Sequence, residues 1–388
     1  MEITALNKCS GCAACADSCP KSCITMTYDK YGFYRPKVDE TICVKCGKCI
    51  SICPQNTVPN QNKIQSIYKG FATDIQSESN QKSTSGAISS LLAEEIIARG
   101  GVVVGAAFDE SFNNVKHIIC ENMSQVDLCR GSKYIQSETQ GIYRLVKTKL
   151  DKGQVVLFSG TPCQIAAIKA YLKDDPPNLF TVDLICHGVG STRFFKEYLD
   201  SVRCSSGSET FSHVGFRDKC GHYRDSQFRI LSSAGVVVKE RFAQTNYFGK
   251  AFANNFISRE SCGTCQFAKR TRVSDITLAD NFLFNSKFEE IWGSSLIFIN
   301  TEKGALLLES IREKSVIEEL EKEEVLPLVA HLNHPSEPHK NRKKVLNAMV
   351  KRGFKKAIKY LPRDPLKKRA ARLLRRAIRH FKRKLHLA

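Results

Sequence analysis

Hydrophobic and polar residues follow a different pattern in each of three parts of the chain. Residues 1–60 are rich in cysteine and turns, and their one regular stretch, ITMTYDKYGFYRPKVD, alternates around Gly32 as a β-hairpin does. Over 61–335, short apolar strands alternate with amphipathic helices. Over 336–388, apolar residues recur at helical spacing among lysines and arginines. We therefore expect a small α+β domain, a larger α/β domain and a basic helical tail.

The larger region contains strand–helix units, which predict a mainly parallel sheet. Such a sheet collects the carboxyl ends of its strands at one edge, where open α/β sheets bind ligands. The units are a helix over 86–98 followed by a strand over 102–108, a strand over 155–158 followed by a helix over 165–172, and a strand over 180–185 followed by a helix over 192–202.

The cysteine content indicates metal or redox chemistry in a reducing compartment. The chain has 17 cysteines, an odd number, and its first residues lack the charged and then apolar pattern of a secretory signal. No apolar run reaches the ~20 residues that cross a bilayer. We therefore expect a cytoplasmic protein without a disulfide framework, in which clustered cysteines bind metal.

Two cysteine runs of identical spacing give the most specific signal in the sequence. Each reads C-x2-C-x2-C-x3-C-P, which is the ligand pattern of a ferredoxin-like domain with two [4Fe–4S] clusters. In that pattern three cysteines of a run bind one cluster, and the fourth points at the other. The expected ligand sets are Cys9, Cys12 and Cys15 with Cys53, and Cys43, Cys46 and Cys49 with Cys19.

A pair of tetrahedral zinc sites is the alternative, since such sites also use CxxC pairs. Three evenly spaced cysteines and a fourth before proline favour iron–sulfur ligation instead. Cys23 lies outside both runs, and we interpret it as a spare buried thiol. Two clusters held close together predict stepwise electron transfer from an external donor to a site elsewhere, with a purely structural role as the alternative.

Further cysteines lie where strands turn into helices. Cys163 in SGTPCQ and Cys186 in DLICHG are expected at the carboxyl edge of the sheet, and a thiol at a helix N-terminus is biased toward thiolate. We hypothesise that these two and the later CxxC of Cys262 and Cys265 bind a third [4Fe–4S] cluster; two core cysteines beside an unrelated CxxC are the alternative. His187 is a candidate proton donor or a structural hydrogen-bonder. The remaining cysteines are expected to be packing residues: Cys120, Cys129, Cys204 and Cys220.

A phosphate-binding cradle is expected at the start of the helix over 86–98. No G-x-G-x-x-G and no P-loop motif occurs. Thr84, Ser85 and Gly86 open the helix and Ser89 lies one turn in, so N–H groups and hydroxyls could hold a pyrophosphate, although the same residues also form an ordinary N-cap. One-electron clusters need a two-electron partner for hydride transfer to an organic substrate, and a flavin converts between the two. We therefore expect FAD.

Five segments resemble the beta subunit family of coenzyme F420-reducing hydrogenase and dehydrogenase. They are TSGAISSLL, GSKYIQSE, SGTPCQIAAIK, DLICHGVGS and CGTCQFAKRTRVSDITLAD, in fixed order over about 83–300. The resemblance implies FAD and iron–sulfur clusters that pass electrons between ferredoxin-like carriers and a conjugated organic ring. It supports FAD at Thr84 to Ser89 and near Lys133 and Tyr134, supports the third cluster, and implies a role beside surface polysaccharide synthesis.

The sequence departs from that family after the CxxC. Relatives typically read Gly-Asp and then an aromatic pair, whereas this chain has Ala279, Asp280, Asn281 and Phe282, without the tryptophan. The resemblance is therefore not extended to coenzyme F420 itself, and the identity of the organic substrate is left open.

The basic tail supplies nearly all of the formal charge of +20. After Asp364 and Pro365, apolar residues form one stripe of a helix whose opposite face is almost wholly lysine and arginine. The regular stripe favours an anionic membrane surface over nucleic-acid binding or a disordered, solvated tail. The earlier run RKKVLNAMVKRGFKKAIKYL repeats the arrangement less cleanly. The stripe consists of Leu366, Leu373, Leu374, Ile378, Phe381 and Leu385.

Together these features predict a cytoplasmic iron–sulfur flavoprotein oxidoreductase that its tail holds at the inner face of the membrane. Electrons from a ferredoxin-like partner enter the first domain, cross the third cluster and reach FAD and an organic substrate. The rival interpretation is a non-enzymatic electron carrier or assembly partner. Bound flavin favours the enzyme, and a flavin-free protein favours the carrier.

Overall fold

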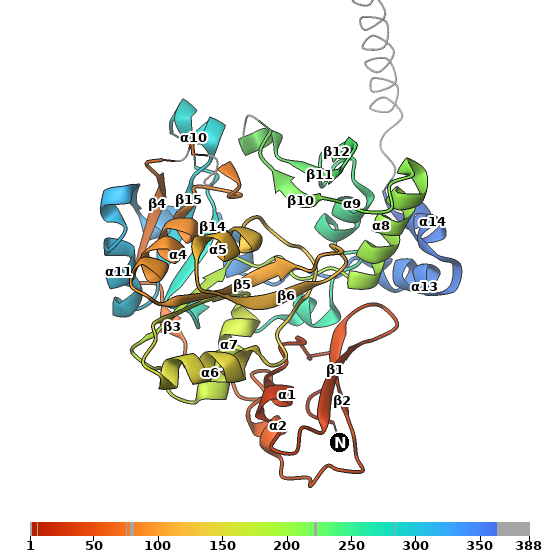
Figure 1. The fold of residues 1–388 in the computed structure, drawn as a ribbon, viewed down its shortest axis with the longest axis horizontal. Coiled ribbons are helices and arrows are strands. Elements are labelled where there is room, and N and C mark those ends of the chain that lie inside the picture. Colours follow the sequence, from red (N-terminus) through yellow and green to blue (C-terminus); the bar gives the residue numbers. More distant parts are fainter. Residues whose placement is uncertain are drawn as a thin grey trace, which may run out of the picture.

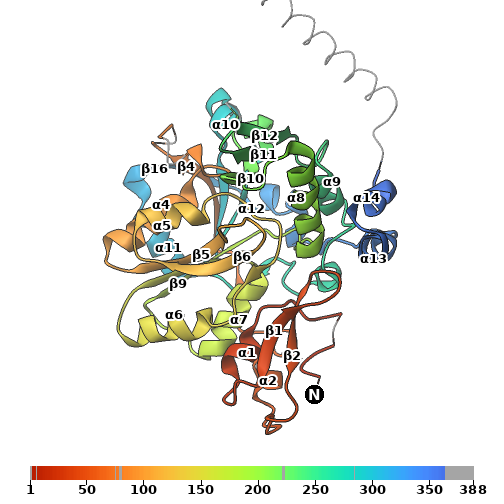
Figure 2. The ribbon, with the colours of Figure 1, turned by 45° about the vertical axis from the view of Figure 1, so that its right-hand side comes forward.

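The computed structural model describes residues 2–5, 7–74, 76–77, 81–220, 223–283 and 285–362. The N-terminal domain lies at one end of a large central sheet, and a smaller aromatic-rich layer lies beside that sheet (Figures 1 and 2). The helix predicted after Pro365, with its apolar stripe, lies outside the described residues.

The N-terminal domain pairs one hairpin with two short helices. Tyr28 lies opposite Tyr34 in the antiparallel pair of strands, which confirms the hairpin around Gly32. Gly32 has a φ of +82°, and a Cβ at this position would lie 2.3 Å from the backbone nitrogen of Arg193 in the larger domain, so the turn requires glycine. The elements are α1 (Ala14–Ser18), β1 (Ile24–Tyr28), β2 (Tyr34–Val38) and α2 (Lys48–Ser51).

A nine-stranded mixed sheet forms the centre of the molecule, in the order β16-β4-β15-β14-β9-β8-β5-β6-β7. Strands β14, β9, β8 and β5 are parallel neighbours, and antiparallel pairs flank them on both sides. The predicted α/β domain with a parallel core is confirmed, and its edges are mixed. The strands are β4 (Ser66–Ala72), β5 (Val102–Phe108), β6 (Val115–Cys120), β7 (Ser137–Glu138), β8 (Val156–Gly160), β9 (Leu179–Leu184), β14 (Ile276–Asp280), β15 (Ser295–Ile299) and β16 (Ser315–Leu320), with a separate pair of β3 (Asn62–Lys63) and β13 (Thr271–Arg272).

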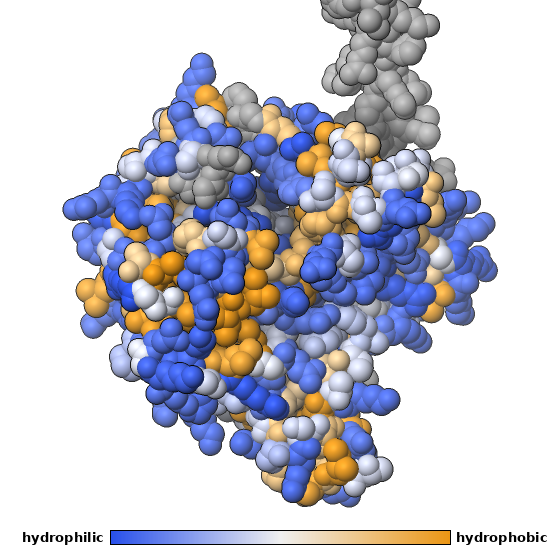
Figure 3. All heavy atoms as spheres, in the orientation of Figure 1, coloured by the Kyte–Doolittle hydropathy of each residue, from blue (hydrophilic) through white to orange (hydrophobic). Residues whose placement is uncertain are grey.

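Alternation along the parallel strands explains why helices cover both faces of this sheet. On β5, Val103 packs with α4 and α11, while Val102 and Val104 pack with α6 and α7 on the opposite face. Apolar side chains also gather on the surface around α4 and α5 (Figure 3). The helices are α4 (Ile88–Ala98), α5 (Met123–Cys129), α6 (Ile142–Asp151), α7 (Pro162–Leu172), α10 (Lys287–Trp292), α11 (Glu302–Glu309) and α12 (Lys322–Val325).

A second antiparallel sheet and four helices enclose an aromatic core beside the central sheet. The ring centroid of Phe216 lies 5.1 Å from that of Phe195 and 5.6 Å from those of Phe228 and Phe248. Aromatic pairs at such separations stabilise a core beyond the burial of their area. The elements are α8 (Thr192–Ser206), β10 (His213–Asp218), β11 (Gln227–Ser232), β12 (Gly235–Glu240), α9 (Tyr247–Ala253), α13 (Arg342–Arg352) and α14 (Phe354–Ala357).

The first basic run of the tail belongs to this aromatic layer. Leu346 and Met349 of α13 are buried, and the ring of Phe354 in α14 lies 5.2 Å from that of Phe194 in α8. The tail expected over 336–388 therefore begins only after α14, because an amphipathic helix with a basic outer face fits a protein core as well as a lipid surface. Within the described ranges, no helix is both long and apolar enough to cross a membrane.

Hydrogen bonds to backbone atoms fasten the N-terminal domain to the larger domain. The Asp17 carboxylate accepts from the amides of Gly141, at 2.6 Å, and Tyr143, at 3.0 Å, at the start of α6. The Tyr143 hydroxyl in turn donates to the carbonyl of Cys12 at 2.7 Å, and Arg144 donates to the carbonyl of Asp17 at 2.8 Å. Asp17 thus caps a helix of the larger domain, where the positive end of the helix dipole favours a carboxylate.

Replacing Leu346 by alanine is expected to destabilise the protein by about 2–5 kcal/mol, because the change leaves a cavity in a packed core. Leu306 of α11 is 73% exposed, and its alanine variant should change the stability by less than about 0.5 kcal/mol. The measurement is the shift of the urea midpoint at unchanged slope, under anaerobic conditions. Equally small shifts in the two variants would show that α13 is not part of the folded body.

Candidate functional site

The eight cysteines of the two N-terminal runs line two separate small cavities. A turn of helix separates the third cysteine of each run from the fourth, so the fourth reaches the other group. These are the two sets that the sequence predicts as cluster ligands. We call them the inner nest, Cys9, Cys12, Cys15 and Cys53, and the outer nest, Cys19, Cys43, Cys46 and Cys49.

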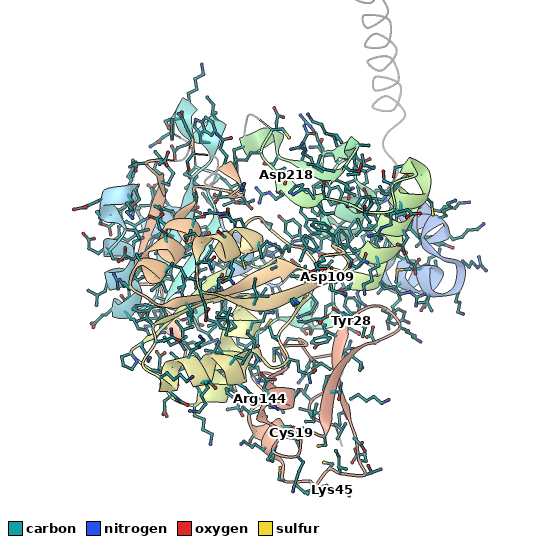
Figure 4. All side chains as sticks on the ribbon, in the orientation of Figure 1. Cys19, Tyr28, Lys45, Asp109, Arg144 and Asp218 are labelled. Carbon is teal, nitrogen blue, oxygen red and sulfur yellow. The ribbon has the colours of Figure 1, made fainter. Side chains whose placement is uncertain are left out.

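The inner nest is buried, whereas the outer nest reaches solvent. Cys12 and Cys15 are buried, and Cys46 is exposed. Burial raises the pKa of both inner thiols well above its ordinary value, because a thiolate loses its hydration there. A cationic iron centre would offset that loss. Figure 4 shows Cys19 and Lys45, which line the outer nest, toward the end of the domain away from the central sheet.

Cys23 lies beside the outer nest, a contact that the sequence did not indicate. Its sulfur is 3.3 Å from that of Cys19, and it lines the same cavity as Cys43. The side chain is buried, as expected of a spare thiol, but it touches a predicted ligand. Its place four residues after Cys19 is the sequence feature that brings the two sulfurs together.

Four cysteines of the larger domain line one further cavity, which we call the third nest: Cys163, Cys186, Cys262 and Cys265. The first lies in the first turn of α7 and the second follows β9, so both come from the carboxyl edge of the sheet. Gly188 has a φ of +130°, and a Cβ there would lie 3.2 Å from the Cβ of Cys262. Within the described residues, no three His, Cys, Asp or Glu side chains form a single-ion site; ligands of a four-iron cluster bind different irons and stand farther apart.

Buried polar atoms without partners gather around the third nest. Among the described residues, Ser10 Oγ, His187 Nε2 and Arg259 Nε are buried without a hydrogen-bond partner. All three side chains line the cavity of the third nest. Because native proteins rarely leave buried polar atoms unpaired, their gathering here fits a polar or charged group bound among them.

His187 and His331 stand between the third nest and a larger cavity, and both line each of them. Nδ1 of His187 lies 3.0 Å from Nε2 of His331. Burial and the neighbouring ring lower the pKa of His187, so it is neutral at pH 7. This pairing fits the structural interpretation of His187.

A cavity of about 580 Å³ opens at the carboxyl edge of the central sheet. Its walls include the ends of β8, β9 and β14, part of α4 and the segment that follows α5. Cys186 and Gln136 line both this cavity and the third nest. Of the predicted flavin contacts, Ser89, Lys133 and Tyr134 line it.

The predicted phosphate cradle before α4 is used for packing. The Ser85 hydroxyl donates to the carbonyl of Ser294 at 2.6 Å, and the Gly86 amide donates to Ser295 Oγ at 3.1 Å. A Cβ at Gly86 would lie 2.4 Å from the carbonyl oxygen of Gly70 in β4, so glycine is needed for the close approach of the two segments. Thr84, Ser85 and Gly86 do not line the large cavity.

Lys133 and Arg130 give the large cavity a positive end. Lys133 Nζ donates to the carbonyls of Cys129, at 3.1 Å, and Arg130, at 2.9 Å, and no Asp or Glu of the described residues pairs with it. Burial lowers the pKa of Lys133 to about 8, because the ammonium loses hydration. The ring of Tyr134 lies 4.8 Å from that of Phe252 and thus joins the aromatic core.

The cysteines expected to be packing residues differ among themselves. Cys120 and Cys129 face each other with their sulfurs 3.7 Å apart, and Cys129 also lines the large cavity. Cys220 is partly buried. For Cys204 the expectation is wrong, since it is exposed near the end of α8.

The residues at which the sequence departs from its expected family lie at the rim of the large cavity. Ala279, Asp280 and Phe282 line it, whereas Asn281 is fully buried and bonds within the protein. Asp280 forms an ion pair with Arg217 of β10, so the aromatic layer closes this side of the cavity. A difference in this segment therefore alters the wall of a binding cavity.

Comparisons with known proteins match two parts of the chain. Residues 153–325 match the family defined by the C terminus of the coenzyme F420 hydrogenase/dehydrogenase beta subunit, and residues 8–57 match the "4Fe-4S dicluster domain". A 7Fe ferredoxin of Hydrogenibacillus schlegelii is 27% identical over 59 residues, which are 15% of this chain and 69% of that protein. A structure of the F420-reducing [NiFe] hydrogenase complex from Methanosarcina barkeri covers 77% of this chain and 91% of its own, with 19% identity and a TM-score of 0.45.

Replacing Cys46 by alanine is expected to remove the cluster of the outer nest, which lowers the iron content by about four atoms per chain. The Cys23→Ala variant is the matched control, because Cys23 lines the same cavity but lies outside the ligand set. It should keep its iron. Iron and sulfide assays on anaerobically purified protein make the measurement, and an equal loss of iron in both variants would show that the ligand set is assigned wrongly.

Proposed function

Since residues 153–325 place the chain in the coenzyme F420 hydrogenase/dehydrogenase beta subunit family and residues 8–57 form a 4Fe-4S dicluster domain, we propose that the protein is an iron–sulfur flavoprotein oxidoreductase. In this proposal the chain binds clusters in its three nests and FAD in the large cavity. An external, ferredoxin-like carrier supplies or removes electrons at the outer nest, and an organic substrate reacts at the cavity. A role beside surface polysaccharide synthesis rests on family resemblance.

The observation that carries this proposal is that the four sites form a continuous series. The outer and inner nests share the short helices α1 and α2. The inner and third nests share Ser10 and Gln55, and the third nest and the large cavity share Cys186 and Gln136. Electron transfer weakens steeply with distance, so a series of adjoining sites is what stepwise transfer from the surface to an interior cavity requires.

A third cluster is supported by the donor set and by the charges around it. Four cysteine thiolates are the usual ligands of a [4Fe–4S] cluster. Arg259 and Arg272 line the same cavity, and positive charge favours thiolates over thiols. The alternative of two core cysteines beside an unrelated CxxC does not account for all four thiols facing one cavity.

The large cavity has the size and chemistry of a flavin site. Its volume lies within the usual ~300–1,000 Å³ of ligand pockets. Ser89, Arg130 and Lys133 supply a hydroxyl and cationic groups for phosphates, and we propose these residues in place of the Ser85–Gly86 turn, which bonds within the protein. When bound, a flavin exchanges single electrons with clusters and a hydride with an organic substrate.

Anaerobically purified protein is expected to contain about twelve iron atoms, at four for each cluster, and one flavin per chain. The Cys262→Ala variant should fall to about eight irons and keep the spectroscopic signals of the N-terminal clusters. Cys204→Ala is the matched control, because that cysteine is exposed and lies outside every nest. Iron, sulfide and released-flavin assays make the measurement.

Two results would contradict parts of the proposal. About eight irons in the unchanged protein would exclude the third cluster. A protein with clusters but without flavin would favour the non-enzymatic electron carrier.

We further propose that residues 363–388 attach the protein to an anionic membrane surface. Each lysine or arginine near such a surface contributes up to ~1 kcal/mol, and the apolar stripe of the sequence adds burial at the interface. The run over 342–361 is not part of this proposal, because its apolar side chains belong to the aromatic core.

Removal of residues 363–388 is expected to abolish flotation with vesicles that contain anionic lipid, while the full chain floats with them and not with neutral vesicles. The control keeps every basic residue and replaces Leu373, Leu374 and Ile378 by serine. It should bind more weakly than the full chain, since the stripe supplies part of the affinity. Equal flotation with and without the segment would contradict the membrane proposal, and binding of the full chain to nucleic acid alone would favour the competing one.

A further inference from the structure

Arg259 is a buried arginine that no carboxylate accompanies. Its side chain is 1% exposed, and among the described residues no Asp or Glu pairs with it. Its guanidinium donates to the carbonyls of Cys9, at 3.2 Å, and Tyr34, at 2.9 Å, and to Gln136 Oε1 at 3.0 Å, while Nε has no partner. These neutral acceptors satisfy N–H groups but do not neutralise the charge. A buried charge without a counter-charge is strongly unfavourable, so the site calls for an anion.

The guanidinium lies between the inner and third nests. It binds the backbone of Cys9 in the inner nest, and Arg259 also lines the cavity of the third nest. Thiolates at Cys9, Cys262 and Cys163 favour the charged form of Arg259, whereas burial lowers its pKa. Both neighbouring nests hold thiols that become anionic when they bind a cluster. Two anionic centres therefore flank one cation.

The loops on both sides are built to admit this side chain. Gly11, between two cysteines of the inner nest, has a φ of +70°, and a Cβ there would lie 2.7 Å from Nη2 of Arg259. On the other side, the amide of Arg259 donates to the carbonyl of Val189 at 2.9 Å, and the amide of Cys262 donates to the carbonyl of Arg259 at 3.1 Å. The residue is thus fixed in the loop of the third nest and reaches into the loop of the inner nest.

We infer that Arg259 is a positioning residue for electron transfer, which sets the reduction potentials of the inner and third clusters together. Each one-electron reduction adds one negative charge to a cluster and, in this step, no proton. A fixed positive charge nearby stabilises the reduced form and raises its potential, and the effect is strong in an interior that screens charges weakly. The outer nest, which reaches solvent, depends on Arg259 far less. This inference rests on the proposed clusters, whose presence iron analysis tests separately.

The Arg259→Gln variant removes the charge and keeps a hydrogen-bonding side chain. We expect its inner and third clusters to be reduced with an equilibrium constant at least tenfold smaller, which is a shift of about −59 mV for a one-electron couple. The potential of the outer cluster should change much less. Arg259→Lys keeps the charge and should restore most of both potentials. Redox titrations followed by electron paramagnetic resonance give the potentials, and the same titrations in Cys262→Ala and Cys46→Ala backgrounds assign the signals.

Arg144 provides the matched control. It also joins the two domains through backbone carbonyls, donating to Ala16 at 2.9 Å and to Asp17 at 2.8 Å, but the Asp17 carboxylate accompanies its charge. Arg144→Gln should leave all three potentials close to those of the unchanged protein. A general loosening of the domain contact would instead move the potentials in both glutamine variants.

Three outcomes would overturn the inference. The first is unchanged potentials in Arg259→Gln protein that retains its iron, and the second is an equal shift of all three clusters or an equal effect of Arg144→Gln. The third is loss of iron from both Arg259→Gln and Arg259→Lys, which would assign the residue to folding alone. If only the glutamine variant loses iron, near-normal potentials in the lysine variant support the inference, because charge is what the two variants do not share.

Discussion

The hydrogen bonds that hold the inner nest against the larger domain are the constraint on which the proposed function depends. They reach main-chain atoms of the cysteine loop itself: the carbonyl of Cys12 accepts from Tyr143, and that of Cys9 accepts from Arg259 and from Ser261 at 3.0 Å. Bonds to the main chain fix the position of a loop more directly than contacts between its side chains. A cluster held in the inner nest is therefore placed relative to the third nest by the fold itself, and the continuity of the series of sites follows from this docking.

Local spacing explains why the sequence predicts the nests so completely. In each N-terminal run a turn of helix lies between the third and fourth cysteines, so the exchange of ligands between the runs is encoded within a few residues. Cys163 and Cys186 follow neighbouring parallel strands, β8 and β9, whose carboxyl ends meet at one edge. The pair of Cys262 and Cys265 is different. It comes from a turn remote in sequence, and only the packing of the loop that contains Gly188 brings it to the same cavity.

Other expectations failed where one sequence pattern serves two environments. The turn at Ser85 and Gly86 reads equally well as an anion cradle or as a close contact, and the distance to Gly70 in β4 decides for the contact. The basic run around Leu346 has a stripe suited to a membrane or to a protein core, and the phenylalanines that cover it lie more than a hundred residues earlier in the chain. Arg259 had no signal at all. Its importance comes from the carboxylate that is absent from its surroundings, which spacing along the chain does not reveal.

Charge and solvent are distributed in opposite directions along the proposed path. At the outer nest Cys46 is exposed, and water and the lysines at positions 45 and 48 can respond to an added electron. Deeper in the protein the thiols are buried, and a reduced cluster there would find no water to solvate it. Fixed cations are the remaining means of stabilising added charge, and Arg259 lies where the two buried nests meet. The same interior that protects a flavin site from solvent thus makes a buried arginine necessary for electrons to reach it.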